Sequence, residues 1–122
     1  MSPFLEAILA AGQGHASANE DGWLCREFRF TAEFPGFAGH FPDKPVLPAL
    51  AQLLCGASVA AMLPGRTLEP TGVRNARFLA PVQPGERILV CARQIDPAAV
   101  EVRAAMEGRT ASTFILEYPS RS

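Results

Sequence analysis

One stretch of this chain limits the possible folds more than any other, an almost uninterrupted apolar run from Leu47 to Leu63. Only Gln52 and Ser58 are plainly polar in it, and Pro64-Gly65 follows as a helix stop signal. A helix that is apolar on nearly every side is a buried helix, and its seventeen residues fall short of the ~20 that span a membrane. We therefore predict a long central helix, near Pro48 to Leu63, inside the core.

A proline-rich loop, Phe34 to Pro48, precedes this helix. It contains one histidine, His40, which we expect to lie near the amino end of the helix. Four prolines and two glycines in these fifteen residues fix or free the backbone at set points, so the loop should follow one specific path. His40 should then have a defined position.

The amino end of the predicted helix lacks the usual capping residue. Val46 and Leu47 stand where Ser, Thr, Asp or Asn would normally accept a free amide hydrogen. We expect the amides of Leu50 and Ala51 to have no side-chain partner. Together with His40, they would form a site for a ligand carbonyl or anion.

Length, charge and cysteine content narrow the class of protein. A chain of 122 residues predicts one domain, residues 1–122, with a core that a partner subunit could complete. The near balance of 11 basic and 12 acidic residues indicates neither nucleic acid nor a membrane surface as partner. Three widely spaced cysteines suggest no disulfide and no metal site, and nothing in the sequence indicates a cofactor. With no basic signal-peptide segment at the start, we expect a reducing, cytoplasmic location.

The rest of the chain is predicted to form mostly strands. Residues 4–11 fit a short helix or a strand, and Gly12–Gly22, with an exposed His15, is predicted to be a polar loop. Two-fold alternation predicts strands, the last three joined as hairpins in a meander of about four strands after the helix. The whole is an α+β fold with one helix on an antiparallel sheet of five or six strands. The predicted strands are Trp23–Phe34, Val73–Val82, Arg87–Ile95, Ala99–Met106 and Thr110–Tyr118.

Two motifs resemble those of a known family. The run Gly39-His40-Phe41-Pro42-Asp43-Lys44-Pro45-Val46-Leu47-Pro48 resembles the Gly-His-Phe-Pro-x-x-Pro-x-x-Pro-Gly signature of (3R)-hydroxyacyl-[acyl carrier protein] dehydratases. Downstream, Asn75-Ala76-Arg77-Phe78-Leu79-Ala80-Pro81-Val82-Gln83-Pro84-Gly85-Glu86 is similar to the family's Asn-x-x-Phe-x-x-Pro-Val-x-Pro-Gly-Asp. The region that carries the resemblance, Phe34 to Arg87, is about half of the chain.

The resemblance implies a hotdog fold, in which the sheet wraps around the central helix, and a homodimer or higher oligomer with an apolar acyl tunnel at its interface. It implies acyl thioesters of acyl carrier protein or coenzyme A as ligands, and a place in fatty-acid or polyketide-type biosynthesis. The residues that it places at the ligand are Gly39, His40, Phe41, Pro48, Ala49, Leu50, Leu54 and Ser58.

The resemblance also shows a departure at the predicted site. In that family the loop histidine works with a helix carboxylate of the other subunit fourteen residues on, where this chain has Leu54, and the family's glutamine corresponds to Ser58. The family's glycine after the last proline is Ala49 here. Removing water from a 3-hydroxyacyl thioester needs a base for the C2 proton and an acid for the hydroxide, and leucine can be neither.

Several interpretations of the site remain open at this stage. His40 alone shuttles the proton, or a carboxylate of Asp43, Glu33 or Glu86 assists, or His40 only hydrogen-bonds the loop. Cys55 is either a small core residue or a nucleophile, and the Ser58 hydroxyl either bonds back to the helix or orients water or substrate. Asn75 and Arg77 are interpreted as strand surface.

Three functions follow as hypotheses. The first is a dehydratase-like protein that binds acyl thioesters. The second is a thioesterase of the same fold that uses His40 and the free helix amides as an oxyanion site. The third is a non-catalytic subunit that pairs with an active homologue.

Overall fold

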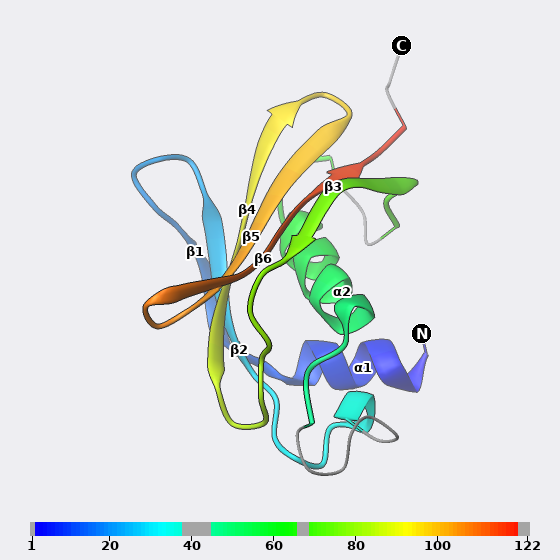
Figure 1. The fold of residues 1–122 in the computed structure, drawn as a ribbon. Coiled ribbons are helices and arrows are strands. Elements are labelled where there is room, and N and C mark those ends of the chain that lie inside the picture. Colours follow the sequence, from blue (N-terminus) through cyan, green and yellow to red (C-terminus); the bar gives the residue numbers. More distant parts are fainter. Residues whose placement is uncertain (1, 38–44, 66–68, 120–122) are drawn as a thin grey trace.

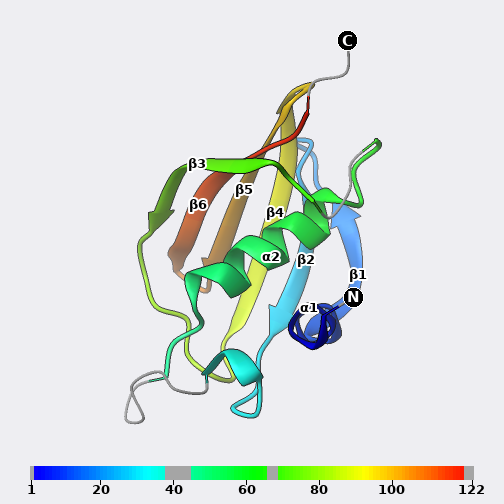
Figure 2. The same ribbon diagram turned by 90° about the vertical axis from the view of Figure 1, so that its right-hand side faces the viewer.

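The computed structural model describes residues 2–37, 45–65 and 69–119. Six strands form one antiparallel sheet in the order β1-β2-β4-β5-β6-β3, and helix α2 lies across one face of it (Figures 1 and 2). Helix α1 lies beside α2, near strands β1 and β2 (Figure 2). The elements are α1 (Pro3–Ala10), β1 (Gly12–Ala18), β2 (Leu24–Arg29), the 3-10 helix η1 (Pro35–Phe37), α2 (Ala49–Ala60), β3 (Gly72–Phe78), β4 (Arg87–Asp96), β5 (Ala99–Met106) and β6 (Arg109–Glu117).

The core lies between α2 and the sheet, because alternate residues of the central strands point toward the helix. Helix α2 lies close against the sheet at Gly56, where an added Cβ would lie 2.7 Å from the Phe114 ring and 2.9 Å from Val102. Only glycine fits this approach without a shift of the buried neighbours. The inward residues of the central strands include Ile88, Val90, Ala92, Val100, Val102, Ala104, Phe114 and Leu116, all essentially inaccessible to solvent.

The predicted central helix is present but shorter than expected, since α2 ends at Ala60 and a turn follows. The expectation that it is buried on every side is wrong for the single chain. Leu50 is 57% exposed, and Leu53 and Leu54 are only partly buried. Among the described helices, none is long and apolar enough to cross a membrane.

The strand predictions succeed best in the second half of the chain. Strands β4, β5 and β6 form the predicted hairpins, and β5 has the predicted bounds of Ala99–Met106. The predicted meander of four is wrong in one respect, because β3 pairs with β6 at the far edge of the sheet and not with β4. The chain between β3 and β4 therefore passes from one edge of the sheet to its middle.

The first quarter of the chain differs more from the prediction. Residues 4–11, left open, form α1, whose amino end is capped by the Ser2 hydroxyl accepting from the Leu5 amide at 3.1 Å. Gly12–Gly22 is not a polar loop but mostly strand β1, which pairs with β2 at an irregular register. The residues of β1 are exposed or half-buried, because this edge strand is not covered by α2. Its sequence therefore lacks the alternation of apolar and polar residues that would have predicted a strand.

A disulfide joins Cys25 of β2 to Cys91 of β4, which contradicts the expectation of none. The two residues are 66 apart in the chain but directly opposite each other in the β2–β4 register. Wide spacing in sequence is thus no obstacle, because pairing between non-consecutive strands brings the residues together. The reducing compartment inferred from the cysteines loses this support.

Candidate functional site

The two sequence motifs meet at the amino end of α2. The Leu47 amide donates a hydrogen bond to the Val82 carbonyl at 2.7 Å, which ties the end of the first motif to the second. The Gly85 amide donates to the Phe30 carbonyl, also at 2.7 Å, and holds the second motif against the segment after β2. Residues that are 35 and 55 positions apart in the chain are therefore fixed side by side.

A cluster of phenylalanines fixes the start of the proline-rich loop. The buried Phe34 ring lies 4.6 Å from that of Phe30, 5.5 Å from Phe4 and 5.8 Å from Phe37. Such edge-on and tilted pairs hold their geometry well. The predicted loop residues Gly39, His40, Phe41 and Asp43 themselves lie outside the described residues.

The amino end of α2 has no side-chain cap, as predicted. Pro48 is the capping residue, in an extended conformation and without a side-chain hydrogen bond. The Ala51 amide has no side-chain partner, as predicted, but it donates to the backbone carbonyl of Pro48 at 3.1 Å, as the Gln52 amide does at 3.3 Å. Ala49 and Leu50, predicted at the ligand, are both exposed in the first turn.

The positions of the family's helix acid and glutamine are occupied by groups without that chemistry. Leu54 is partly buried against the core and stands one turn after Leu50 in α2. Ser58 is buried and its hydroxyl donates to the Cys55 carbonyl at 2.7 Å, so the hydroxyl is engaged within the helix. Cys55 is fully buried, and burial raises the pKa of its thiol, which fits the core reading and disfavours a nucleophilic thiolate.

The two described carboxylates considered as substitutes for the acid are both held elsewhere. A hydrogen bond from the Thr31 side chain, followed by one from its own backbone, lowers the pKa of the exposed Glu33 carboxyl. Glu86 accepts from the Gln83 amide at 2.8 Å and from Arg109 at 2.7 Å, inside the predicted turn whose Gly85 has a φ of 86°. The lowered pKa keeps the Glu33 carboxyl charged, and the Glu86 side chain is engaged by Gln83 and Arg109, so neither is a suitable proton donor.

An open groove of about 280 Å³ lies where the motifs meet. One wall is formed by Val46, Leu47 and Ala49, before and at the start of α2, and the other by residues 78–81, which begin at the last residue of β3. Gln52 is the polar residue of this lining and is only 4% exposed. Its Nε2 donates to the Leu47 carbonyl at 3.4 Å, whereas its Oε1 has no hydrogen-bond partner in the part of the chain that the structure describes.

Sequence reasoning did not single out Gln52 as a site residue. The available signal was an amide side chain in an otherwise apolar helix run, one turn before Gly56. That pattern indicates a polar group facing the core, which needs either a partner or a function.

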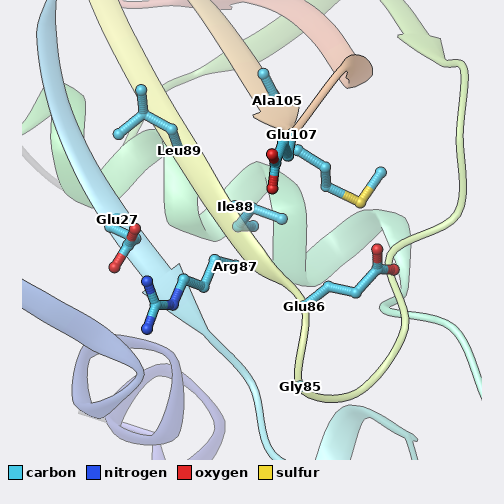
Figure 3. Close-up of a pocket in the computed structure, with 9 residues that line it drawn as sticks. Glu27, Gly85, Glu86, Arg87, Ile88, Leu89, Ala105 and Glu107 are labelled. Atoms are coloured by element: carbon cyan, nitrogen blue, oxygen red, sulfur yellow. The ribbon is translucent and has the colours of Figure 1, made fainter.

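A larger cavity, of about 720 Å³, lies on the opposite face of the sheet from α2. Figure 3 shows Leu89 and the charged side chains of Glu27, Glu86, Arg87 and Glu107 around it, with Ile88 turned toward the helix behind the strand. Among the described residues no group of three His, Cys, Asp or Glu side chains could hold a metal ion. The cavity shares no residue with the groove at α2.

Comparison with known proteins now identifies the family. The model of the family described as ApeI-like, ApeI dehydratase, matches residues 16–113. This chain belongs to the ApeI-like dehydratase family. The matched range includes both motifs and α2, and therefore all of the residues that line the groove.

Curated relatives support this assignment, and solved structures share the fold. The 3-hydroxyacyl-[acyl-carrier-protein] dehydratase FabZ of Nitrosospira multiformis is 32% identical over 96 residues, which cover 67% of this chain and 66% of that protein. The structure titled the dehydratase heterocomplex ApeI:P from Xenorhabdus doucetiae has a TM-score of 0.71 at 24% identity, with 84% of this chain and 92% of that chain covered. Zebra fish thioesterase superfamily member 2 has a TM-score of 0.64 at 12% identity, with 94% and 85% covered. These structures confirm the predicted hotdog fold.

Proposed function

We propose that this ApeI-like protein binds acyl thioesters of acyl carrier protein or coenzyme A, with the acyl chain in the groove at the amino end of α2. The observation that carries the proposal is the groove itself, whose walls are apolar residues of the two family motifs held together by the Leu47–Val82 hydrogen bond. An apolar cleft with few polar groups is the usual form of a small-molecule site. We propose His40, six residues before Val46 in the chain, as the base of this site.

The chemistry available to this site is weaker than that of an acid–base pair. His40 can act as base for the C2 proton, but Leu54 provides no acid for the departing hydroxide. A missing acid or base costs roughly a hundred- to ten-thousand-fold in rate. We therefore expect slow dehydration or hydration by the chain alone.

The protein should work as a homodimer joined through the β3 side of the sheet. Strand β3 ends the sheet and all its residues but Gly72 are exposed, including Val73 at 41% and Phe78 at 45%. Leu50 and Leu79, 57% and 60% exposed, extend this apolar surface. A second copy would cover it and pair the free strand edge.

A second candidate function is that of a non-catalytic subunit paired with an active homologue. The specific observation in its favour is Leu54 at the position of the family's acid. In addition, a solved structure with a similar fold is that of the dehydratase heterocomplex ApeI:P. The partner would then supply the carboxylate that this chain lacks. A cytoplasmic location stays a prediction, and the Cys25–Cys91 disulfide counts against the reducing environment on which it was based.

The test is turnover of a 3-hydroxyacyl thioester by wild type and His40→Ala, each alone and mixed with a homologue that has the helix carboxylate. Slow turnover by wild type that is lost in His40→Ala supports a weak dehydratase. Turnover only in the mixture supports the subunit reading. Release of free thiol without dehydration would identify a thioesterase, and fast turnover unaffected by His40→Ala would contradict the site assignment.

A further inference from the structure

Gln52 differs from every other residue that lines the groove, because it places a buried amide in an apolar wall. Its side chain is 4% exposed, and the other lining residues, Val46, Leu47, Ala49 and residues 78–81, are all apolar. A buried amide with an unused oxygen is unfavourable, and native proteins seldom keep one without a purpose.

The orientation of this amide follows from its one hydrogen bond. The Leu47 carbonyl, 3.4 Å from Nε2, can only accept, so the NH₂ group must face it. Oε1 therefore faces away from Leu47, and it has no partner among the described residues. It presents an acceptor, and only an acceptor, to whatever reaches it.

A buried water does not satisfy this acceptor well. An ordered internal water needs two to four polar partners, and Gln52 has the one polar side chain among the described residues that line the groove.

We propose that Gln52 is a ligand-binding residue whose Oε1 accepts a hydrogen bond from an O–H or N–H donor of the acyl thioester in the groove. This inference rests on the proposed function. Two parts of such a ligand carry a donor of this kind: a hydroxyl on the acyl chain and the amides of the pantetheine arm. An unsubstituted alkyl chain would leave Oε1 unpaired and should bind less well.

The test compares two inert thioethers, S-(3-hydroxyoctyl)-pantetheine and S-octyl-pantetheine, which can be neither dehydrated nor hydrolysed. Their dissociation constants are measured for wild type, Gln52→Met and Val59→Ala. Gln52→Met keeps the size of the side chain and removes the acceptor. Val59→Ala is the matched control, since Val59 is a fully buried residue of α2 that does not line the groove.

We expect wild type to prefer the hydroxyalkyl thioether by about fivefold, and Gln52→Met to lose this preference while Val59→Ala keeps it. Equal weakening of both thioethers in Gln52→Met alone supports the bond to a pantetheine amide. Unchanged binding in Gln52→Met, or the same loss in Val59→Ala, overturns the inference. Should Gln52→Met not fold, a crystal structure of wild type with the hydroxyalkyl thioether decides. A ligand O or N within hydrogen-bond distance of Oε1 supports the inference, and water there overturns it. If wild type binds neither thioether, the proposed function itself fails.

Discussion

Replacing Leu54 by glutamate tests whether the missing helix acid is what limits catalysis. Leu54 is the sixth residue of α2, past the first turn, so the helix dipole adds little to the energy of a carboxyl there. The site is partly buried, and burial favours the neutral acid, which raises the pKa of the introduced carboxyl. The protonated form is the one that donates a proton to the leaving hydroxide.

The expected magnitudes follow from this position. Exchanging a partly buried leucine for a carboxyl should cost about 1–3 kcal/mol of the free energy of unfolding. Because the folded pKa is raised above the unfolded value of about 4.3, the variant is most stable below that pH and loses stability as pH rises toward the folded pKa. The rate of dehydration should increase by roughly a hundredfold to ten-thousandfold if the carboxyl reaches the reacting hydroxyl.

The assay is turnover of a 3-hydroxyacyl thioester from pH 5 to 9, with Leu54→Gln as the matched control. Gln has the same shape and a similar stability cost but carries no transferable proton. We expect a gain only in Leu54→Glu, falling at high pH as the carboxyl ionises. If Leu54→Glu folds, dimerises and is no faster than Leu54→Gln, the chain has lost more than its acid, and the subunit reading becomes the better one.

Three further predictions concern the assembly and the core. Phe78→Asp should give a monomer of about 13.1 kDa by light scattering. Leu89→Asp is the control, since Leu89 is 46% exposed and Phe78 45%, and this variant should stay dimeric because Leu89 lies on the opposite face of the sheet. The same mass for both variants would contradict the β3 interface. Gly56→Ala should lower the free energy of unfolding by about 1 kcal/mol, because overpacking against Phe114 and Val102 outweighs the gain in helix propensity, and a higher melting temperature would refute this. Reducing the Cys25–Cys91 disulfide should lower the free energy of unfolding of wild type by about 2–4 kcal/mol, because the bond closes a long loop. The reductant should not change the stability of the double variant Cys25→Ala/Cys91→Ala. An unchanged unfolding curve for reduced wild type would argue against the disulfide.

Predictions from sequence succeed here where burial imposes a period. The residues Val100, Val102, Ala104 and Met106 alternate and are all buried, and β5 has the predicted bounds. The apolar run after the proline loop gives α2 for the same reason. The exposure of α2 around Leu50 could not be predicted. An apolar sequence indicates that the helix surface must be covered, but not whether the same chain or a second chain covers it.

The failures share a different cause, since each depends on which strands become neighbours. The polar β1 lies at the edge of the sheet, where no core enforces alternation, and β3 pairs with β6 instead of β4. The Cys25–Cys91 disulfide depends on the pairing of β2 with β4, which the order of the chain does not reveal. Gln52 appeared only as a polar residue, because its unpaired oxygen becomes visible once the Leu47 carbonyl and the groove walls are in place.

The most direct test of the proposed function is a crystal structure of the protein with S-octyl-pantetheine. We predict that the alkyl chain lies in the groove between residues 46–49 and 78–81, with the sulfur toward His40. Two results would contradict the assignment of the groove as the acyl site. One is an alkyl chain bound in the 720 Å³ cavity beside Glu27 and Arg87, and the other is no binding at millimolar ligand.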